Sequence, residues 1–354
     1  MKVLFFWEAA GLSLEKANPY AGLLGRAMTG LGVEFEAGFR SQLAPEFLEA
    51  NRNAVTVLHF NWPSALYSDP DPRVAVGRAA EFVSAINHAR SLGIKVVWTM
   101  HNLYPHDTTL FELDRLVRLA LTACADSIIV HCENGREQLR RHFFRAHAVF
   151  TIPHGNFIEP YPNTLTRREA RARLGIEEDK FVYLFFGTIR TNKGVENLIE
   201  AFGGLPDPDA VLLLAARVYN DYGDTIVDRA RHADPRISVL RSTFYQNDEF
   251  QLFYNAADIA VFPFTDILTS GSAITALSLG CPVIVPAIGC LPELMDERIG
   301  LTYDPAHPAA LGEALARARR IDLAPCRVAA LDAMRKLHWK GIAGRTLLAY
   351  GVKA

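Results

Sequence analysis

The chain has 354 residues, of which 50% are hydrophobic and 21% charged, and its formal net charge is −2. This length suits two domains, and the near-neutral charge gives no support to nucleic acid as the main partner. No window approaches the roughly 18 apolar residues of a membrane span. The chain opens directly on a strand-like K-V-L-F-F, without the pattern of a signal peptide. We therefore expect a cytoplasmic protein.

Short apolar runs alternate with longer amphipathic segments along the first half. The runs that predict strands are Val3–Trp7, Val33–Ala37, Val55–Phe60, Lys95–Met100, Ser127–His131 and Val149–Ile152. The helical patterns between them include Tyr20–Leu31, Val74–Leu92, Leu113–Ala123 and Gly135–Phe144. Continuous apolar strands separated by helices predict an α/β fold with a parallel sheet covered on both faces.

The same alternation resumes after a polar, proline-rich stretch at 160–166, where we place the domain linker. A short helix at Arg167–Leu174 is followed by six more strand-like runs: Phe181–Phe186, Ala210–Ala216, Ile237–Arg241, Ile259–Phe264, Pro282–Pro286 and Leu301–Tyr303. The last segment, Arg327–Tyr350, has a helical pattern. We expect two Rossmann-like, doubly wound domains facing a cleft, at 1–160 and 161–330, and a C-terminal helix within 331–354 that packs back on the first domain.

Two basic residues lie in the loop that follows the run Phe181–Phe186. Gly187 and Thr188 end the strand pattern, Arg190 and Lys193 follow, and a helical pattern opens at Val195. Backbone N–H groups and the positive end of a helix favour an anion at such a place, and two cations strengthen that field. The loop therefore predicts a phosphate site, although an ordinary turn with two solvated cations has the same pattern.

A second loop of this kind follows Ile259–Phe264. Thr269, Ser270 and Gly271 precede a helix that begins near Ser272. Serine and threonine are good N-caps, and glycine allows a ligand to approach the backbone closely. This predicts a second phosphate-binding helix N-terminus in the same domain, with simple capping as the alternative.

Polar and aromatic residues follow several strands of the first domain, so we expect them to gather at one edge of its sheet. They are Glu8, His59, Asn61, Trp62, His101, Asn102, His106, Asp107, His131 and His154. A histidine or aspartate there can act as general base, although Asp107 equally suits a helix cap. No metal is expected, since these histidines come from separate strand ends and no helical H-x-x-x-H is present. The hydrolase elbow G-x-S-x-G and the dinucleotide motif G-x-G-x-x-G are also absent.

These motifs together resemble a known enzyme family. The loop G-T-I-R-T-N-K-G at 187–194, the S-G-S before A-L-S-L-G-C-P-V-I-V-P, and the ending H-W-K-G-I-A look like the GT-B glycosyltransferases. The first-domain motifs N-P-Y, H-F-N-W-P and T-M-H-N-L-Y-P-H-D narrow the resemblance. They are similar to bacterial exopolysaccharide enzymes typified by the xanthan-assembly β-1,4-mannosyltransferase.

The resemblance implies roles for particular residues. Arg190 and Lys193, with Gly187 and Thr188, would hold the diphosphate of a nucleotide-sugar donor. The residues expected around the rest of the donor are Ser270, Gly271 and Ser272 at the phosphates or sugar, Thr275 at the ribose, and Tyr245, Asp248 and Glu249 at the base. The acceptor side would be formed by Asn61, Trp62, His101, Asn102 and His154.

The chain departs from the family at one pair of positions. Many retaining GT-B enzymes carry two glutamates around the second loop, where this chain has Ile267 and Thr275. The departure favours an inverting, β-forming transfer, which needs one base for the acceptor hydroxyl. Asp107 is the first choice for that base, His106 the second and Glu8 the third. The cations and the helix dipole would stabilise the leaving diphosphate, so no metal or other cofactor is expected.

We therefore expect an inverting hexosyltransferase that moves mannose from GDP-mannose to a lipid-linked saccharide in exopolysaccharide assembly. Such an acceptor places the enzyme on the cytoplasmic face of the inner membrane, where the basic segment Arg136–Arg145 is a candidate docking helix. The alternatives are a retaining GT-B transferase with another nucleotide sugar, a UDP-sugar epimerase, and a non-catalytic nucleotide-sugar-binding protein.

Overall fold

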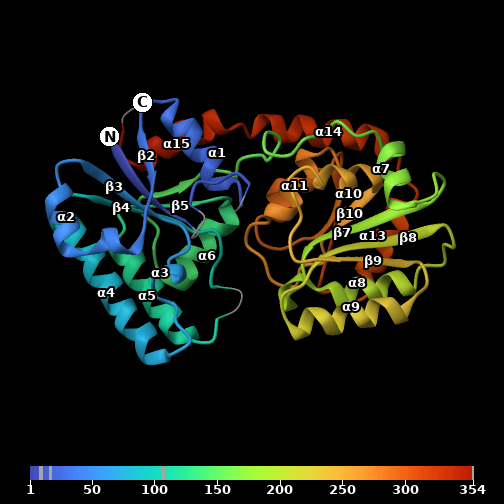
Figure 1. Ribbon diagram of the computed structural model, residues 1–354, viewed down its shortest axis with the longest axis horizontal. Coiled ribbons are helices and arrows are strands. Elements are labelled where there is room, and N and C mark those ends of the chain that lie inside the picture. The colour runs from blue at the N-terminus through green and yellow to red at the C-terminus, as the bar shows by residue number, and fades with distance from the viewer. Residues whose placement is uncertain (8–10, 16–17, 106–107, 353–354) are drawn as a thin grey trace. The chain divides into compact units, whose positions relative to one another are not determined.

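The computed structural model describes residues 1–7, 11–15, 18–105 and 108–352. The chain divides into two compact units (Figure 1). Unit 1 comprises Met1–Gly155 together with Leu337–Ala354, and unit 2 comprises Asn156–Lys336. Unit 1 is thus built from two separate stretches of sequence.

Within the described residues, unit 1 contains a six-stranded sheet in the order β2-β1-β3-β4-β5-β6, with every neighbouring pair parallel. The strands are β1 (Lys2–Phe6), β2 (Glu34–Ala37), β3 (Val55–Phe60), β4 (Lys95–Thr99), β5 (Ser127–Val130) and β6 (Val149–Thr151). The chain runs from β1 outward to β2 and then returns to β3 on the other side. The junction of β1 and β3 is therefore the point where the strand order reverses, the usual ligand position in such sheets.

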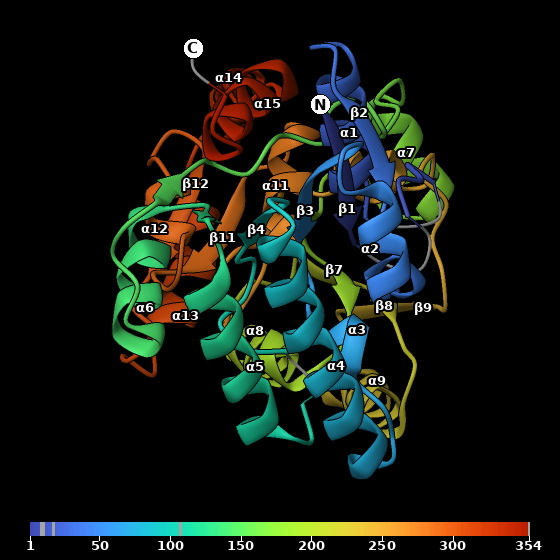
Figure 2. The same ribbon diagram turned by 90° about the vertical axis from the view of Figure 1, so that its left-hand side faces the viewer.

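Helices cover both faces of this sheet because its strands are apolar on both sides. On β3, His59 meets Tyr350 beside α15 (Trp339–Ala349), whereas Phe60 packs on Phe82 of α4 (Pro72–Ser91). Helix α1 (Tyr20–Thr29) contacts α15, and α5 (Phe111–Cys124) runs beside α4 (Figure 2). The shorter helices of unit 1 are η1 (Arg40–Leu43), α2 (Pro45–Asn51), α3 (Ser64–Tyr67) and α6 (Glu133–Phe143).

Unit 2 repeats the architecture with the order β12-β11-β10-β7-β8-β9, again parallel throughout. Its strands are β7 (Phe181–Thr188), β8 (Ala210–Arg217), β9 (Ile237–Ser242), β10 (Ile259–Val261), β11 (Val283–Pro286) and β12 (Gly300–Tyr303). The chain moves from β7 outward to β9 and then restarts at β10 on the other side of β7. The reversal point of unit 2 therefore lies between β7 and β10.

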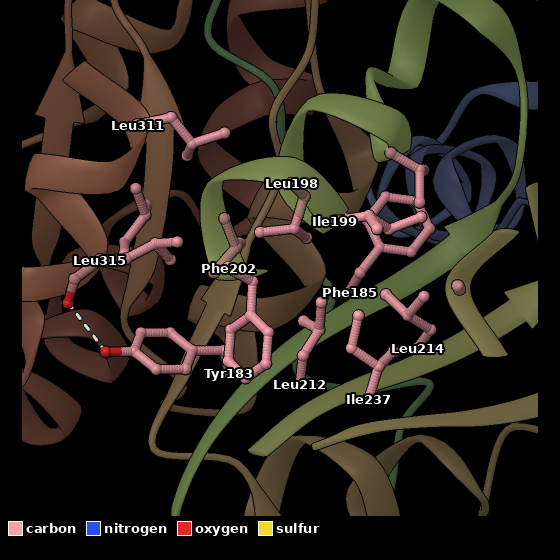
Figure 3. Close-up of a cluster of buried hydrophobic side chains, with 14 of the residues drawn as sticks. Tyr183, Phe185, Leu198, Ile199, Phe202, Leu212, Leu214, Ile237, Leu311 and Leu315 are labelled. Carbon is pink, nitrogen blue, oxygen red and sulfur yellow. Dashed lines mark hydrogen bonds between the residues drawn. The ribbon is translucent and has the colours of Figure 1, made fainter. Parts of the chain in front are cut away.

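The helices of unit 2 also form two layers (Figure 1). One layer contains α8 (Val195–Gly203), α9 (Asp221–Ala233) and α13 (Ala310–Ala318), and the other contains α7 (Arg167–Leu174), α10 (Phe250–Ala256), α11 (Gly271–Ser278) and α14 (Leu323–Lys336). Residues 191–193 form a 3₁₀ turn, η2, and residues 291–294 form α12. Figure 3 shows the core under the first layer, where the buried Tyr183 hydroxyl donates to the Leu315 carbonyl at 2.8 Å.

The C-terminal segment differs from its prediction. The single helix predicted over Arg327–Tyr350 is wrong, because α14 ends at Lys336 and α15 begins at Trp339. His338 between them has extended backbone, with φ −75° and ψ 143°, and its ring accepts a hydrogen bond from the Gly341 N–H. An imidazole cap of this kind starts a new helix, and a periodic apolar pattern does not reveal it.

Candidate functional site

The loop after β7 is held in one backbone conformation. Gly194 begins α8 with φ +61°, a left-handed conformation, and a Cβ added there would lie 2.1 Å from the Pro263 carbonyl oxygen. Asn192 links the same loop to the segment after β10. Its side-chain N–H₂ donates to the Asp266 backbone carbonyl at 3.1 Å, and its backbone carbonyl accepts from the Thr265 N–H at 3.0 Å. The loops that follow β7 and β10 are therefore bonded to each other at the reversal point of unit 2.

We expect Gly194→Ala to lower the free energy of unfolding of unit 2 by about 3 kcal/mol or more. The new methyl group adds left-handed backbone strain to a clash with rigid backbone. Gly203→Ala on the same helix is the matched control, since its Cβ meets no atom within 4 Å, and we expect a stabilisation of about 0.5–1 kcal/mol. Chemical denaturation of both variants measures the difference. Equal stability of the two variants contradicts the role assigned to Gly194.

The N-terminus of α11 lies beside the end of β7. A Cβ built on Gly187 would lie 3.8 Å from Ser272 Oγ. Ser270 is the N-cap, since its hydroxyl accepts from the Ala273 N–H at 3.1 Å. Gly271 and Ser272 belong to the first turn of α11, whose N–H groups have no acceptor within a helix. Ser272 lies beside the carboxyl end of β7, at the edge of the sheet between β7 and β10. The structure thus brings the S-G-S segment and the Arg190/Lys193 loop together.

Lys193 is the most perturbed cation of this edge. Its Nζ lies over the Phe264 ring, 4.5 Å from the ring centroid. Burial, followed by the charge of Arg190, lowers the pKa of Lys193 to about 8. A partly desolvated ammonium interacts strongly with an anion, and binding of the anion restores its full charge.

Three other predicted donor residues have hydroxyl or carboxylate groups engaged nearby. The buried Thr275 hydroxyl donates to the Gly271 carbonyl at 2.8 Å within α11. The Tyr245 hydroxyl donates to the Leu240 carbonyl at 2.9 Å, and burial raises its pKa to about 12. A Glu249 carboxylate oxygen accepts from the Gln246 N–H at 2.6 Å. The ring of Tyr245 packs on Phe186 at the end of β7, so this loop lines the same edge.

Arg217 joins this edge and was missed by sequence reasoning. It ends β8 in register with Thr188 of β7. Its guanidinium lies over the Tyr219 and Phe244 rings at 5.4 and 5.9 Å, and its buried Nε has no hydrogen-bond partner among the described residues. The signal in the sequence is an apolar run, L-L-L-A-A, that ends in arginine. A third cation therefore lies one strand away from the Arg190/Lys193 loop.

The polar strand ends of unit 1 form a second cluster, around the reversal point of its own sheet. The His101 ring stacks on Trp62 at 5.1 Å and lies 4.9 Å from His131, whose ring is 5.3 Å from His154. Tyr20 packs against all three histidines. Of the residues expected to gather, Asn61, Trp62, His101, His131 and His154 lie together, whereas His59 lies within β3 and contacts Tyr350 and Thr99. The cluster also includes the buried Asn102, Trp7 and Trp339.

Burial is the main cause of the shifted pKa values of four buried histidines of unit 1, namely His59, His101, His131 and His154. It lowers the pKa of His59 and of His154 to about 3 and that of His131 to about 4, and it lowers the pKa of His101 well below its usual value. All four imidazoles are therefore neutral near pH 7. The indole N–H groups of Trp7 and Trp62 are buried and have no hydrogen-bond partner among the described residues.

The three residues predicted as candidate bases, Glu8, His106 and Asp107, lie outside the described residues. The segment that begins at Thr108 is anchored by Asp114 of α5. The hydroxyls of Tyr67 and Thr108 both donate to its carboxylate, and Arg118 lies 3.6 Å from the same group. Sequence reasoning missed Asp114, because on an amphipathic helix a buried aspartate has the same appearance as a solvated one.

Among the described residues, no group of three or more histidine, cysteine, aspartate or glutamate side chains is arranged to hold a metal ion. Over the same residues, no helix combines the length and apolarity needed to cross a membrane.

Comparison with known proteins identifies a matching family model and similar relatives. Residues 166–322 match the family model described as glycosyl transferases group 1. The chain is 26% identical over 246 residues to the GDP-mannose:glycolipid 4-beta-D-mannosyltransferase of Xanthomonas campestris pv. campestris, covering 67% of this chain and 63% of that relative. A D-inositol 3-phosphate glycosyltransferase of Streptomyces bingchenggensis is 28% identical over 200 residues, covering 53% of this chain and 44% of that relative.

Solved structures match over nearly the whole chain. Sucrose-phosphate synthase from Thermosynechococcus elongatus superposes with a TM-score of 0.73 at 20% identity, covering 99% of this chain and 98% of that one. Anabaena HepE in complex with UDP and glucose superposes with a TM-score of 0.72 at 18% identity, covering 99% of both chains. The predicted α/β fold and the resemblance are confirmed. The chain therefore has the GT-B fold of glycosyltransferases, and its second unit matches group 1 of these enzymes over residues 166–322.

Proposed function

We propose that the protein is an inverting glycosyltransferase that moves mannose from GDP-mannose to a lipid-linked saccharide. The observation that carries the proposal is the edge between β7 and β10, where Lys193 lies over Phe264 and Ser272 of α11 lies beside Gly187 of β7. Lys193 and Arg190 bind the donor diphosphate there, and Arg217 supplies a further positive charge beside them. These fixed charges stabilise the diphosphate as it leaves, so the transfer needs no metal or other cofactor.

The choice of donor, acceptor and stereochemistry is supported by similarity to the Xanthomonas enzyme, whose name specifies GDP-mannose, a glycolipid and a β product. The same stereochemistry agrees with the absence of the glutamate pair, since Ile267 and Thr275 are both buried side chains without a carboxylate. In the transfer, the acceptor oxygen forms a bond to the anomeric carbon while the bond from that carbon to the diphosphate breaks on the opposite face. The acceptor proton must pass to a general base.

A lipid-linked acceptor places the protein at a membrane surface, for which α6 offers the matching chemistry. Arg140 and Arg141 are exposed and pair with Glu137, and Phe144 at the end of the helix is 79% exposed. Phe143 is buried and belongs to the core, so Phe144 is the apolar contact available to lipid. We propose peripheral attachment to anionic lipid on the cytoplasmic face of the inner membrane.

The test combines binding and transfer by the full chain. Titration calorimetry with GDP, UDP and TDP is expected to show tightest binding for GDP. Incubation with GDP-mannose and a polyprenyl-diphosphate-linked saccharide is expected to give a β-linked product by NMR. UDP binding without GDP binding contradicts the donor assignment, and an α-linked product identifies a retaining transferase. Nucleotide binding without transfer to any lipid-linked acceptor identifies a non-catalytic nucleotide-sugar-binding protein.

A further inference from the structure

The guanidinium of Arg217 in unit 2 retains hydrogen-bond donors that the described residues do not use. Its Nη2 donates to the Tyr219 hydroxyl, whereas Nη1 has no acceptor and the group has no carboxylate partner among the described residues. The Tyr219 hydroxyl is itself held in place, since it donates to the Thr243 carbonyl at 2.7 Å. Both Nη1 hydrogens and one Nη2 hydrogen of a positioned arginine are therefore left for a ligand.

The register of the strands fixes the face of the sheet on which Arg217 lies. Phe186 of β7 pairs with Ala215 of β8, and Thr188 pairs with Arg217, so these four side chains share one face. Phe186 packs on Phe253 of α10, which places this face under the layer that also contains α11. Arg217 therefore lies on the α11 side of the sheet, one strand spacing of about 4.8 Å from the end of β7.

Two aromatic rings flank the guanidinium and remain open to solvent. Its central carbon lies 5.4 Å from the centroid of the Tyr219 ring and 5.9 Å from that of the Phe244 ring. Tyr219 is 57% exposed and Phe244 is 43% exposed. Exposed aromatic rings bind nucleobases by stacking, and a guanidinium that is already positioned loses little freedom when it forms new hydrogen bonds. The end of β8 therefore offers both ring surface and fixed donors.

On the other side of β7, the loops after β10 and β11 pack directly on each other. A Cβ added to Gly289 would lie 2.2 Å from the Ile267 carbonyl oxygen and 2.7 Å from that of Leu268. The Cys290 N–H also donates to the Leu268 carbonyl at 2.7 Å. A nucleoside whose diphosphate lies at the end of β7 is therefore expected over the ends of β8 and β9 rather than over β11.

Tyr245, which the resemblance assigns to the base of the nucleotide, lies beside Arg217. Burial raises the pKa of Tyr245 to about 12, the charge of Glu249 raises it as well, and the charge of Arg217 opposes both. The Tyr245 ring packs on Phe186, on the face that Arg217 shares. Arg217 therefore lies where the base of a bound nucleotide is expected.

We propose that Arg217 recognises the guanine base of the donor through its O6 and N7 atoms. This inference rests on the proposed function and assigns one residue to the choice of nucleotide. Guanine has two acceptors side by side at O6 and N7, and a planar guanidinium matches them with two N–H groups. Adenine has an amino group in place of O6, and uracil has no N7. Fixed paired donors therefore favour guanine over both bases, while the charge of Arg217 still adds to the field at the diphosphate.

The test measures binding of GDP, IDP, ADP, UDP and inorganic pyrophosphate to the full chain by titration calorimetry. The unchanged chain is expected to bind GDP and IDP with similar affinity, because hypoxanthine retains O6 and N7, and to bind ADP and UDP about tenfold or more weakly. Arg217→Gln is expected to weaken GDP and IDP binding about tenfold or more and to change pyrophosphate binding by about twofold at most. A glutamine amide matches adenine, so the preference for GDP over ADP is expected to disappear.

Arg241→Gln is the matched control. Arg241 lies on β9 in register with Ala216, so its side chain lies on the opposite face from Arg217, and it pairs with Asp224 of α9 at 2.7 Å. We expect this control to bind all five probes as the unchanged chain does. Arg217→Met, which keeps an unbranched side chain between the two rings, is a second variant and is expected to lose the preference for guanine equally. Circular dichroism shows whether each variant is folded.

Each contrary result has a separate meaning. Equal losses for GDP and pyrophosphate in Arg217→Gln assign Arg217 to the phosphates and overturn the proposal. Tight GDP binding with weak IDP binding by the unchanged chain places recognition at the 2-amino group and overturns it as well. A preference for GDP that survives in both Arg217 variants contradicts the role of Arg217 alone, whereas a preference of the unchanged chain for UDP contradicts the proposed donor.

Discussion

Lys193→Ala is expected to weaken binding of the nucleoside diphosphate at least tenfold and to lower kcat by about 10²–10³. The ammonium lies in a desolvated position over Phe264, where its interaction with an anion is stronger than at an exposed site. Lys180→Ala is the matched control, because Lys180 precedes β7 at the opposite end of the strand and pairs with Asp209 at 3.0 Å. We expect the control to bind the diphosphate as the unchanged chain does.

The pKa of Lys193 gives the same prediction a pH dependence. The free protein loses the lysine charge as pH rises through about 8, whereas a bound diphosphate favours the charged form. Affinity is therefore expected to fall above pH 8, and binding at pH 8.5 is expected to take up protons. Titration calorimetry in buffers of different ionisation enthalpy measures that uptake. Tight binding by Lys193→Ala, or binding without proton uptake at pH 8.5, contradicts the assignment of Lys193.

Unit 1 is expected to lose stability steeply in mild acid. Burial lowers the pKa of His59 and His154 to about 3, whereas a histidine in the unfolded chain has a pKa of about 6.5. Below pH 6.5 the unfolded chain therefore binds more protons than the folded chain. The stabilisation from each neutral histidine is complete above that pH and is lost as pH falls toward 3. The loss is about 1.4 kcal/mol per pH unit for each histidine, or about 2 kcal/mol each at pH 5.

The position of the tryptophans makes this loss measurable for unit 1 alone. All four tryptophans of the chain, Trp7, Trp62, Trp98 and Trp339, belong to unit 1. Urea denaturation followed by tryptophan fluorescence is expected to give a free energy of unfolding that is several kcal/mol lower at pH 5 than at pH 7. His59→Leu is expected to lower the free energy of unfolding at pH 7, because Tyr350 and Thr99 lose their partner. It is also expected to lower by about one the number of protons that unit 1 takes up on unfolding in mild acid. An unchanged pH dependence in this variant contradicts the explanation.

The architecture could be predicted from the sequence because buried parallel strands are continuous apolar runs, and those runs alternate with helices. The loop containing Lys193 could be located for the same reason, since it follows such a run directly. Arg217 and Asp114 could not be identified in this way, because their importance comes from neighbours distant in the sequence. Arg217 pairs in register with Thr188, and Asp114 receives the hydroxyl of Tyr67. Propensity and periodicity contain no information about such pairs.

The break in the C-terminal segment shows a second limit of sequence reasoning. The apolar positions continue in helical spacing through residues 327–350, so the pattern predicts one helix. The capping hydrogen bond between the His338 ring and the Gly341 N–H ends that continuity. Histidine is not among the residues usually expected at an N-cap, so its role became visible only in three dimensions.

The return of the chain to unit 1 has a consequence for biosynthesis. His59 and Tyr350, whose side chains meet at 2.6 Å in the middle of unit 1, are 291 residues apart. Ser127 and Lys95 likewise bind the carbonyls of Ala349 and Tyr350, at 2.6 and 2.8 Å. Because a ribosome adds residues from the N-terminus, unit 2 has its complete sequence while unit 1 still lacks α15. The half of the protein that is translated first is therefore the half that completes its folding last.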